Sequence, residues 1–110
     1  GIVLILFVCV YLAPPPCHDE VKSEAHSPDG SYTATIFERD CGATTDYSTI
    51  LSIRKRSTPF NGKKGIILVV EGRREIAVLW QGPTHLTVKN DQGKRFLQET
   101  TFEGITITYE

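Results

Sequence analysis

The chain has 110 residues, with 12 Lys and Arg against 13 Asp and Glu, 40% hydrophobic residues and three cysteines. This length fits one domain, because two cores would leave each half too small to bury enough surface. The composition excludes a disordered chain, a collagen, a coiled coil and a dense disulfide scaffold. The net charge of -1 also argues against a globally basic nucleic-acid binder.

The first 18 residues carry no Asp, Glu, Lys or Arg, and they begin with an apolar run. Residues 2–13 are 12 consecutive apolar residues, and three prolines follow them. As a helix this run would span about 18 Å, short of the roughly 30 Å hydrocarbon core of a bilayer, but its length suits the apolar region of a signal sequence. We interpret residues 1–16 as the remnant of a signal or membrane anchor, with upstream residues missing. A buried core helix or strand is the alternative.

The remaining residues are therefore expected outside the cytoplasm, either anchored to a membrane or in a periplasmic or extracellular space. Cys9 lies inside the apolar run, which leaves Cys17 and Cys41 as the candidate disulfide pair. A bridge between them would contribute roughly 3 kcal/mol in an oxidising compartment. The alternative is an unpaired Cys17, because residues 17–26 are polar, follow the prolines and are interpreted as a linker.

A single β domain is predicted over residues 27–110. Ser27-Pro28-Asp29-Gly30 has the residue types of a tight turn, and the alternation over residues 32–37 predicts a strand after it. Residues 47–56 predict a second strand. Residues 66–70 form a continuous aliphatic run, β-branched except at Leu68, which is typical of a central strand covered on both faces.

Shorter strands are predicted further along the chain, over residues 75–81, 86–88, 94–97 and 105–109. No segment after residue 18 keeps a helical period for more than two turns. About six short strands, spaced roughly ten residues apart, predict an all-β fold: a small antiparallel sandwich or partly open barrel, preceded by the apolar leader.

No arrangement of side chains predicts catalysis. Cys41 and His85 are the pair to consider for a thiol nucleophile and its base, but Gly42 and a loop follow Cys41, where a helix N-terminus would activate the thiol. The His and acidic residues between 18 and 26 lack the spacing of metal ligands. No glycine-rich phosphate loop is present. We therefore expect no enzymatic activity, no metal and no cofactor.

The charges are unevenly distributed along the chain. Seven basic residues and one acid fall between residues 54 and 74, so this stretch carries +6 and the rest of the chain carries -7. If the strands at 47–56 and 66–70 are neighbours, the basic residues gather at the ends of one hairpin. Such a rim would attract anionic lipid headgroups or an acidic partner. The alternative is that these residues only solubilise strand ends and protect edges. The candidate binding residues of this stretch are Arg54, Arg56, Lys63 and Lys64.

The segments Ser27-Pro28-Asp29-Gly30 and Cys41-Gly42-Ala43-Thr44-Thr45 resemble an uncharacterised family of small exported bacterial envelope proteins with one β domain. The resemblance covers roughly residues 27–90, and it implies a location and a fold but no reaction. Within the second segment, Cys41, Gly42, Thr44 and Thr45 are a candidate recognition loop, because a glycine beside small hydroxyl residues leaves backbone N–H groups open to a ligand. The alternative is a turn held by threonine hydrogen bonds.

The sequence therefore predicts a non-catalytic, exported or membrane-tethered accessory or binding module of the cell envelope. Its expected partner is an envelope protein or anionic lipid headgroups, with membrane association through the N-terminal segment and no nucleic acid. The alternative function is a secreted immunity or inhibitor protein that blocks a partner enzyme, for which residues 59–61 would form an exposed apolar patch or a projecting loop.

Overall fold

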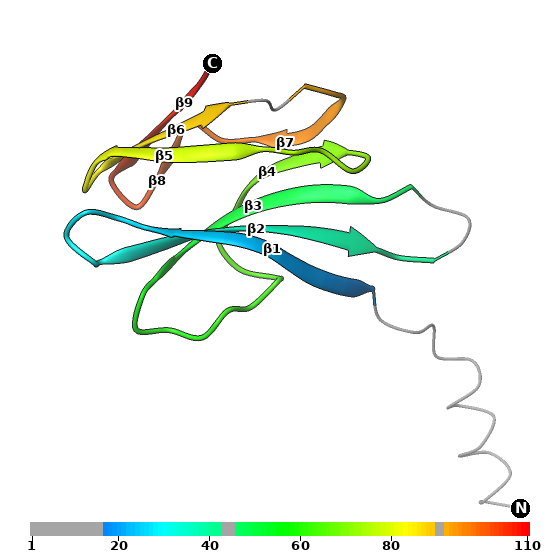
Figure 1. The fold of residues 1–110 in the computed structure, drawn as a ribbon, viewed down its shortest axis with the longest axis horizontal. Helices are drawn as coiled ribbons and strands as arrows, with labels where there is room; N and C mark the ends of the chain where they lie inside the picture. Colours follow the sequence, from blue (N-terminus) through cyan, green and yellow to red (C-terminus); the bar gives the residue numbers. More distant parts are fainter. Residues whose placement is uncertain (1–16, 43–45, 90–91) are drawn as a thin grey trace, which may run out of the picture.

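The computed structural model describes residues 17–42, 46–89 and 92–110, which form an all-β sandwich. Within these residues nine strands make two sheets, which lie in separate layers in Figure 1. The first sheet has the strand order β1-β2-β3-β4-β7, and the second has the order β5-β6-β9-β8. The strands are β1 His18–His26, β2 Tyr32–Asp40, β3 Ser48–Lys55, β4 Ile66–Glu71, β5 Ala77–Gly82, β6 His85–Lys89, β7 Arg95–Gln98, β8 Thr101–Phe102 and β9 Ile105–Tyr109.

The core fills the space between the two sheets. Side chains alternate along a strand, so every second residue of β2, β3, β6 and β9 faces the opposite sheet. Burial of these apolar side chains is the main driving force for folding. The buried cluster consists of Ala34, Ile36, Leu51, Ile53, Ile67, Leu68, Val70, Ile76, Leu86, Val88, Ile105 and Ile107.

β4 is the central strand that the run at residues 66–70 predicts. It pairs with β3 on one side and with β7 on the other, antiparallel in both cases. Ile67 and Leu68 are both 0% exposed although they are adjacent, so both faces of the strand are covered. Backbone pairing at both edges and burial on both faces explain why this segment has no polar alternation.

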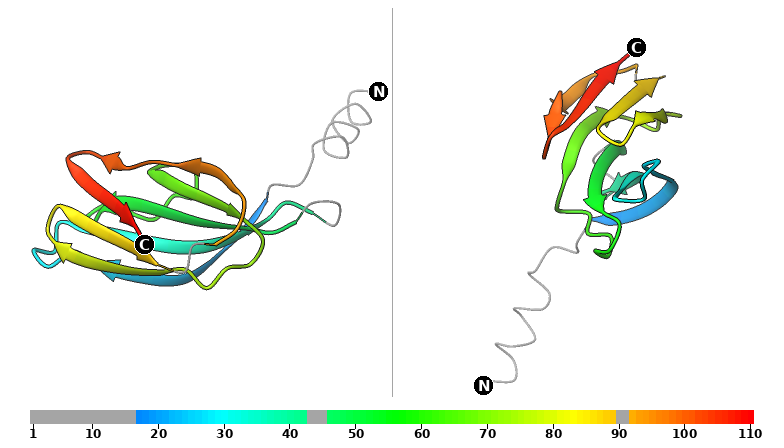
Figure 2. Two further views of the ribbon diagram at one scale, coloured as in Figure 1. Left: turned by 90° about the horizontal axis from the view of Figure 1, so that it is seen from above. Right: turned by 90° about the vertical axis from the view of Figure 1, so that its left-hand side faces the viewer.

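β6 and β9 run parallel, which differs from the predicted antiparallel arrangement. The chain between them leaves the second sheet, forms β7 at the edge of the first, and returns through β8. Because β9 is not joined to β6 by a hairpin, it can enter beside β6 in the same direction. Figure 2 shows β6 and β9 in a layer separate from β1 and β2. The prediction of a small β-sandwich is confirmed, with a mixed second sheet.

The interpretation of residues 17–26 as a linker is wrong, because His18–His26 form strand β1. β1 pairs with β2 from His18, opposite Asp40, to His26, opposite Thr33. The hairpin closes through the predicted turn, in which the Gly30 N–H donates to the Ser27 carbonyl and Gly30 has a φ of 75°. The described β domain therefore begins at Cys17, ten residues earlier than the sequence predicts.

The predicted leader at residues 1–16 lies outside the described residues. In the part of the chain that the structure does describe, no helix combines the length and hydropathy that a membrane-crossing helix needs.

Candidate functional site

The basic stretch divides between the two ends of the β3–β4 hairpin. β3 and β4 are antiparallel neighbours, as the charge argument requires. Arg73 and Arg74 follow β4 at one end, where the Arg73 guanidinium carbon lies 3.9 Å from the centre of the Tyr47 ring. The other five basic residues lie at the end of β3 or in the loop of residues 56–65 that joins it to β4.

Four of these five side chains form what we call the basic rim: Lys55, Arg56, Lys63 and Lys64. All four are exposed. None of them forms an ion pair with an acidic group among the described residues. The rim is therefore a group of uncompensated positive charges at one end of the first sheet.

Arg54 differs from the rim because its charge is neutralised. Its Nη2 atom donates to Glu24 Oε2 of β1 at 2.7 Å, and the Thr35 hydroxyl donates to the same carboxylate oxygen at 3.3 Å. The Nε and Nη1 atoms of Arg54 are buried, without a hydrogen-bond partner among the described residues. Arg54 is thus a structural cation that joins β3 to the edge strand.

The loop of residues 56–65 folds back across the outer face of the first sheet, the face turned away from the second sheet. Its Phe60 ring packs edge-to-face on Phe37 of β2, with ring centroids 5.0 Å apart. Figure 1 shows this loop on the side of β1 and β2 opposite the second sheet. Within residues 59–61, Phe60 has an aromatic partner on the sheet and is half-buried, whereas Pro59 and Asn61 are exposed.

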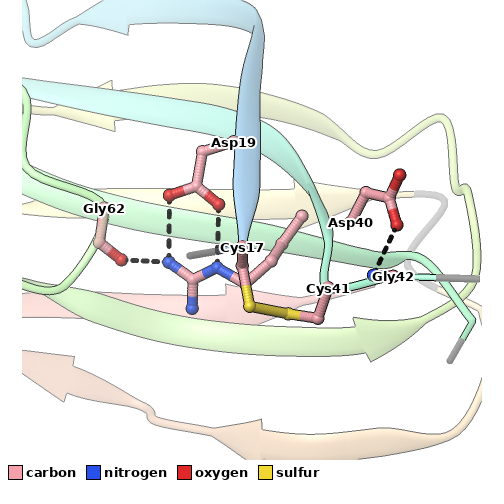
Figure 3. The surroundings of a disulfide bond; sticks show 7 residues. Cys17, Asp19, Asp40, Cys41, Gly42 and Gly62 are labelled. Carbon is pink, nitrogen blue, oxygen red and sulfur yellow. Dashed lines mark hydrogen bonds and ion pairs between the residues drawn. A yellow bond between two sulfur atoms is a disulfide. The ribbon is translucent and has the colours of Figure 1, made fainter. Parts of the chain in front are cut away.

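Arg39 fixes the same loop at a second point. Its guanidinium donates to both carboxylate oxygens of Asp19, at 2.8 and 3.1 Å, and to the carbonyl oxygen of Gly62. Figure 3 draws these hydrogen bonds as dashed lines that end on the labelled Asp19 carboxylate and Gly62 carbonyl. The hydrogen bond with Asp19 raises the pKa of Arg39 above its ordinary value. The charge-assisted bonds join β1, β2 and the loop.

The predicted disulfide between Cys17 and Cys41 is present, with the two sulfur atoms 2.03 Å apart (Figure 3). It lies beside the pair His18 and Asp40, at the open end of the β1–β2 hairpin. A disulfide-bonded pair fits an oxidising, exported environment.

A cleft of about 580 Å³ lies between the loop of residues 56–65 and the turn that joins β8 to β9. Its volume is within the usual range of small-ligand sites. Pro59, Phe60 and Phe102 supply apolar walls, and Lys55 and Lys64 of the basic rim line the same space. Glu103, in the β8–β9 turn, is its acidic lining residue. The remaining lining residues are Ser52, Ile53, Arg54, Thr58, Asn61 and Gly65.

A second hollow, of about 390 Å³, adjoins the turn between β1 and β2. Lys55 and Arg56 line it together with Gly30 and Tyr32. Lys55 thus borders both spaces, and the basic rim continues from the cleft to the second hollow.

The other predicted site residues lie elsewhere. The sulfur of Cys41 is bonded to Cys17, and the Gly42 N–H, which the sequence left open to a ligand, donates to Asp40 Oδ1 at 3.0 Å. Thr44 and Thr45 lie outside the described residues. His85 is on the second sheet, where its Nε2 atom is 2.8 Å from the hydroxyl of Thr108.

Of the predicted basic residues, Lys64 and Arg54 line the cleft, Arg56 lines the second hollow, and Lys63 lines neither. The sequence predicts Phe60 only as part of residues 59–61, the contact segment of the alternative inhibitor function, and it does not predict Lys55, Phe102 or Glu103 as site residues. Lys55 could have been predicted, because it is one of the seven basic residues between residues 54 and 74. Phe102 and Glu103 could not have been predicted, because they are about 40 residues further along the chain and reach the cleft only through the packing of the two sheets.

Among the described residues, no group of three or more His, Cys, Asp and Glu side chains is arranged to hold a metal ion. Comparison of the chain with protein-family models, with curated proteins and with solved structures gave no match. Function is therefore inferred from the chemistry of the basic rim and the cleft.

Proposed function

We propose that this domain is a non-catalytic binding module of the cell envelope, exported or tethered to a membrane, that attaches to anionic lipid headgroups through its basic rim. One observation carries the proposal: Lys55, Arg56, Lys63 and Lys64 are exposed at one end of the sandwich without an ion-pair partner among the described residues. Lys and Arg near an anionic leaflet contribute about 1 kcal/mol each to attachment.

The support of the rim favours this function. Three of its four residues are in the loop that Arg39 and Phe37 hold against the first sheet, so the charges are presented by an ordered surface. Binding to such a surface loses less conformational entropy than binding to a free tail. The disulfide fits an oxidising space where envelope lipids are accessible.

The test is co-sedimentation of the 110-residue chain with phosphatidylglycerol-containing vesicles and with neutral phosphatidylcholine vesicles. The double variant Arg56→Gln/Lys63→Gln removes two rim charges without altering a residue that lines the cleft. The variant Lys89→Gln/Lys94→Gln removes the same charge elsewhere and is the matched control.

We expect binding to the anionic vesicles to fall at least several-fold in the rim variant, to stay near the wild-type level in the control, and to weaken as salt is raised. Neutral vesicles report any attachment through the apolar residues 2–13. Equal binding to both vesicle types, or equal loss in both variants, would contradict the proposal. Binding to an acidic envelope protein without binding to anionic vesicles would assign the rim to that other class of partner.

A further inference from the structure

The cleft has two kinds of wall, and they meet within one space of about 580 Å³. Phe60 and Pro59 form an apolar wall on the loop of residues 56–65, and Phe102 forms another on β8. Lys55 and Lys64, two basic residues, line the same space. A ligand that fills the cleft would therefore contact apolar surface and positive charge together.

The charge balance of the cleft favours an anion. Arg54 is already paired with Glu24 at 2.7 Å, so it is excluded from the balance. The charges that remain are those of Lys55 and Lys64 against that of Glu103. A net positive lining in a partly desolvated space attracts anionic groups more strongly than the same charges in open water.

An anion alone would leave the apolar walls in water. Phe60 and Phe102 are each half-buried, so part of each ring remains accessible. Covering apolar surface contributes about 25 cal/mol per Å², which would add to the attraction of the ammonium groups. A ligand with an apolar chain next to its anionic group fits this lining better than a free anion does.

The cleft is also preorganised. Phe60 is held by Phe37, and the neighbouring Gly62 is held by the guanidinium of Arg39. On the opposite side, Phe102 packs against the core of the sandwich. Walls fixed in this way reduce the ordering cost that binding would otherwise incur.

We propose that the cleft binds a single anionic amphiphile, with the anionic group at Lys55 and Lys64 and the apolar chain between Phe60 and Phe102. This inference rests on the proposed function, because it takes the lipid class that the basic rim attracts and assigns one molecule of it to the cleft. The amphiphile could come from a bilayer or from free solution, and the experiment below distinguishes these two sources by comparing vesicle attachment with binding at the cleft.

The probe is lysophosphatidylglycerol, used below its micellar concentration with the 110-residue chain and followed by backbone amide NMR. We expect chemical-shift changes at Lys64, Gly65 and Phe102, which line the cleft. Glycerol phosphate, the headgroup without the chain, should bind at least tenfold more weakly. Lysophosphatidylcholine, which has the chain but no net charge, should also bind several-fold more weakly.

Substitutions at three exposed positions of the cleft lining test the proposal, because two should weaken binding of the probe and one should tighten it. Lys64→Gln should weaken binding about fivefold or more, whereas Glu103→Gln should tighten it several-fold by removing the acidic group. Pro59→Glu should weaken binding by placing a negative charge in the apolar wall, without altering the buried core. The matched control is Lys94→Gln, which lies outside the cleft lining and should bind as the wild type does.

Several outcomes would overturn the inference. Equal affinity for glycerol phosphate would show a simple anion site. Equal effects of Lys64→Gln and Lys94→Gln, or weaker binding in Glu103→Gln, would place the ligand elsewhere. If the chain attaches to vesicles but the amide chemical shifts at the cleft do not change, the cleft is not the amphiphile site, and the proposed function still holds. If the chemical shifts at the cleft change but the chain does not attach to vesicles, the proposed function is contradicted, and the cleft binds amphiphile from free solution.

Discussion

Gly65 lies where the loop of residues 56–65 re-enters the first sheet, and two features require a glycine there. Its φ is 69°, a left-handed conformation, and a Cβ atom would lie 2.1 Å from the backbone oxygen of Ile53. The Gly65 carbonyl in turn accepts a hydrogen bond from the Ile53 N–H at 2.9 Å. A side chain would therefore disturb both the loop and the pairing of β3 with β4.

We predict that Gly65→Ala lowers the free energy of unfolding by about 2 kcal/mol or more, from the strained φ together with the clash. Gly104→Ala is the matched control, because Gly104 also has a positive φ, 83°, but a Cβ there meets nothing within 4 Å. Its cost should be about 1 kcal/mol, from the backbone strain alone. Urea denaturation of both variants measures the difference, and equal losses would contradict the contribution of the Ile53 contact.

At the residue scale, part of the candidate site was accessible from sequence. Lys64 and Arg56 were selected from a dense basic stretch, and both border hollows on the surface. The neutralisation of Arg54 was not foreseeable, because its partner Glu24 is 30 residues away on a strand that the sequence analysis interpreted as a linker. The pairing of the two aromatic walls was not foreseeable either, because Phe60 is in the loop between β3 and β4 of the first sheet and Phe102 is in β8 of the second.

At the element scale, the strands with apolar alternation or a β-branched run were predictable, and β1 was not. Val21 is the one large aliphatic residue of β1, and it is 44% exposed, so the strand has no apolar periodicity to detect. Its charged residues suit an edge, where they discourage pairing with other chains. β1 is held by backbone pairing with β2 and by the ion pairs of Asp19 and Glu24.

The disulfide is predicted to stabilise this edge strand. Replacing both cysteines in Cys17→Ser/Cys41→Ser should lower the free energy of unfolding by about 3 kcal/mol, because the bridge restricts the unfolded chain over a sequence separation of 24. The double variant leaves neither cysteine of the pair as an unpaired thiol. Hydrogen exchange should rise first at Asp19 and then in the loop of residues 56–65, which Arg39 connects to Asp19.

Thermal denaturation of the oxidised wild type gives the reference, and the reduced wild type is the control for the substitutions. Faster exchange confined to the two cysteine positions, with the loop unchanged, would show that Arg39 holds Gly62 independently of β1. A loss of stability much below 1 kcal/mol would contradict the entropic account of the bridge.

At the scale of the whole molecule, the folded chain separates its charges. The rim collects four cations that have no ion-pair partner within residues 17–42, 46–89 and 92–110, whereas several acids of β1 and β2 are paired with basic side chains, as in Asp19 with Arg39 and Glu24 with Arg54. Although the net charge is only -1, the positive charge of the rim is therefore concentrated at one end of the molecule. Such a distribution orients a protein at a charged surface even when its total charge is close to zero.

The two sheets are joined at one side by Trp80 of β5. Its Nε1 atom donates to the Ala25 carbonyl of β1 at 3.0 Å, while the ring packs against the core cluster. This bond connects the edge strands of the two sheets, because β1 and β5 each stand at the end of their strand order. Trp80 thereby contributes both apolar burial and a polar contact to the sandwich.

We predict that Trp80→Phe, which keeps an aromatic ring but removes the donor, lowers the free energy of unfolding by about 1–3 kcal/mol through the lost bond and the smaller ring. Amide exchange should rise in β1 near Ala25 more than in β6, because β6 keeps its pairing with β5 and β9. Leu79→Ala, at an exposed neighbouring position, is the control and should change stability by less than about 1 kcal/mol. Urea denaturation with amide exchange measures both variants. Uniform acceleration across both sheets would show that Trp80 acts only through the common core, whereas selective opening of β1 would identify the bond to Ala25 as the contact that holds the two edge strands together.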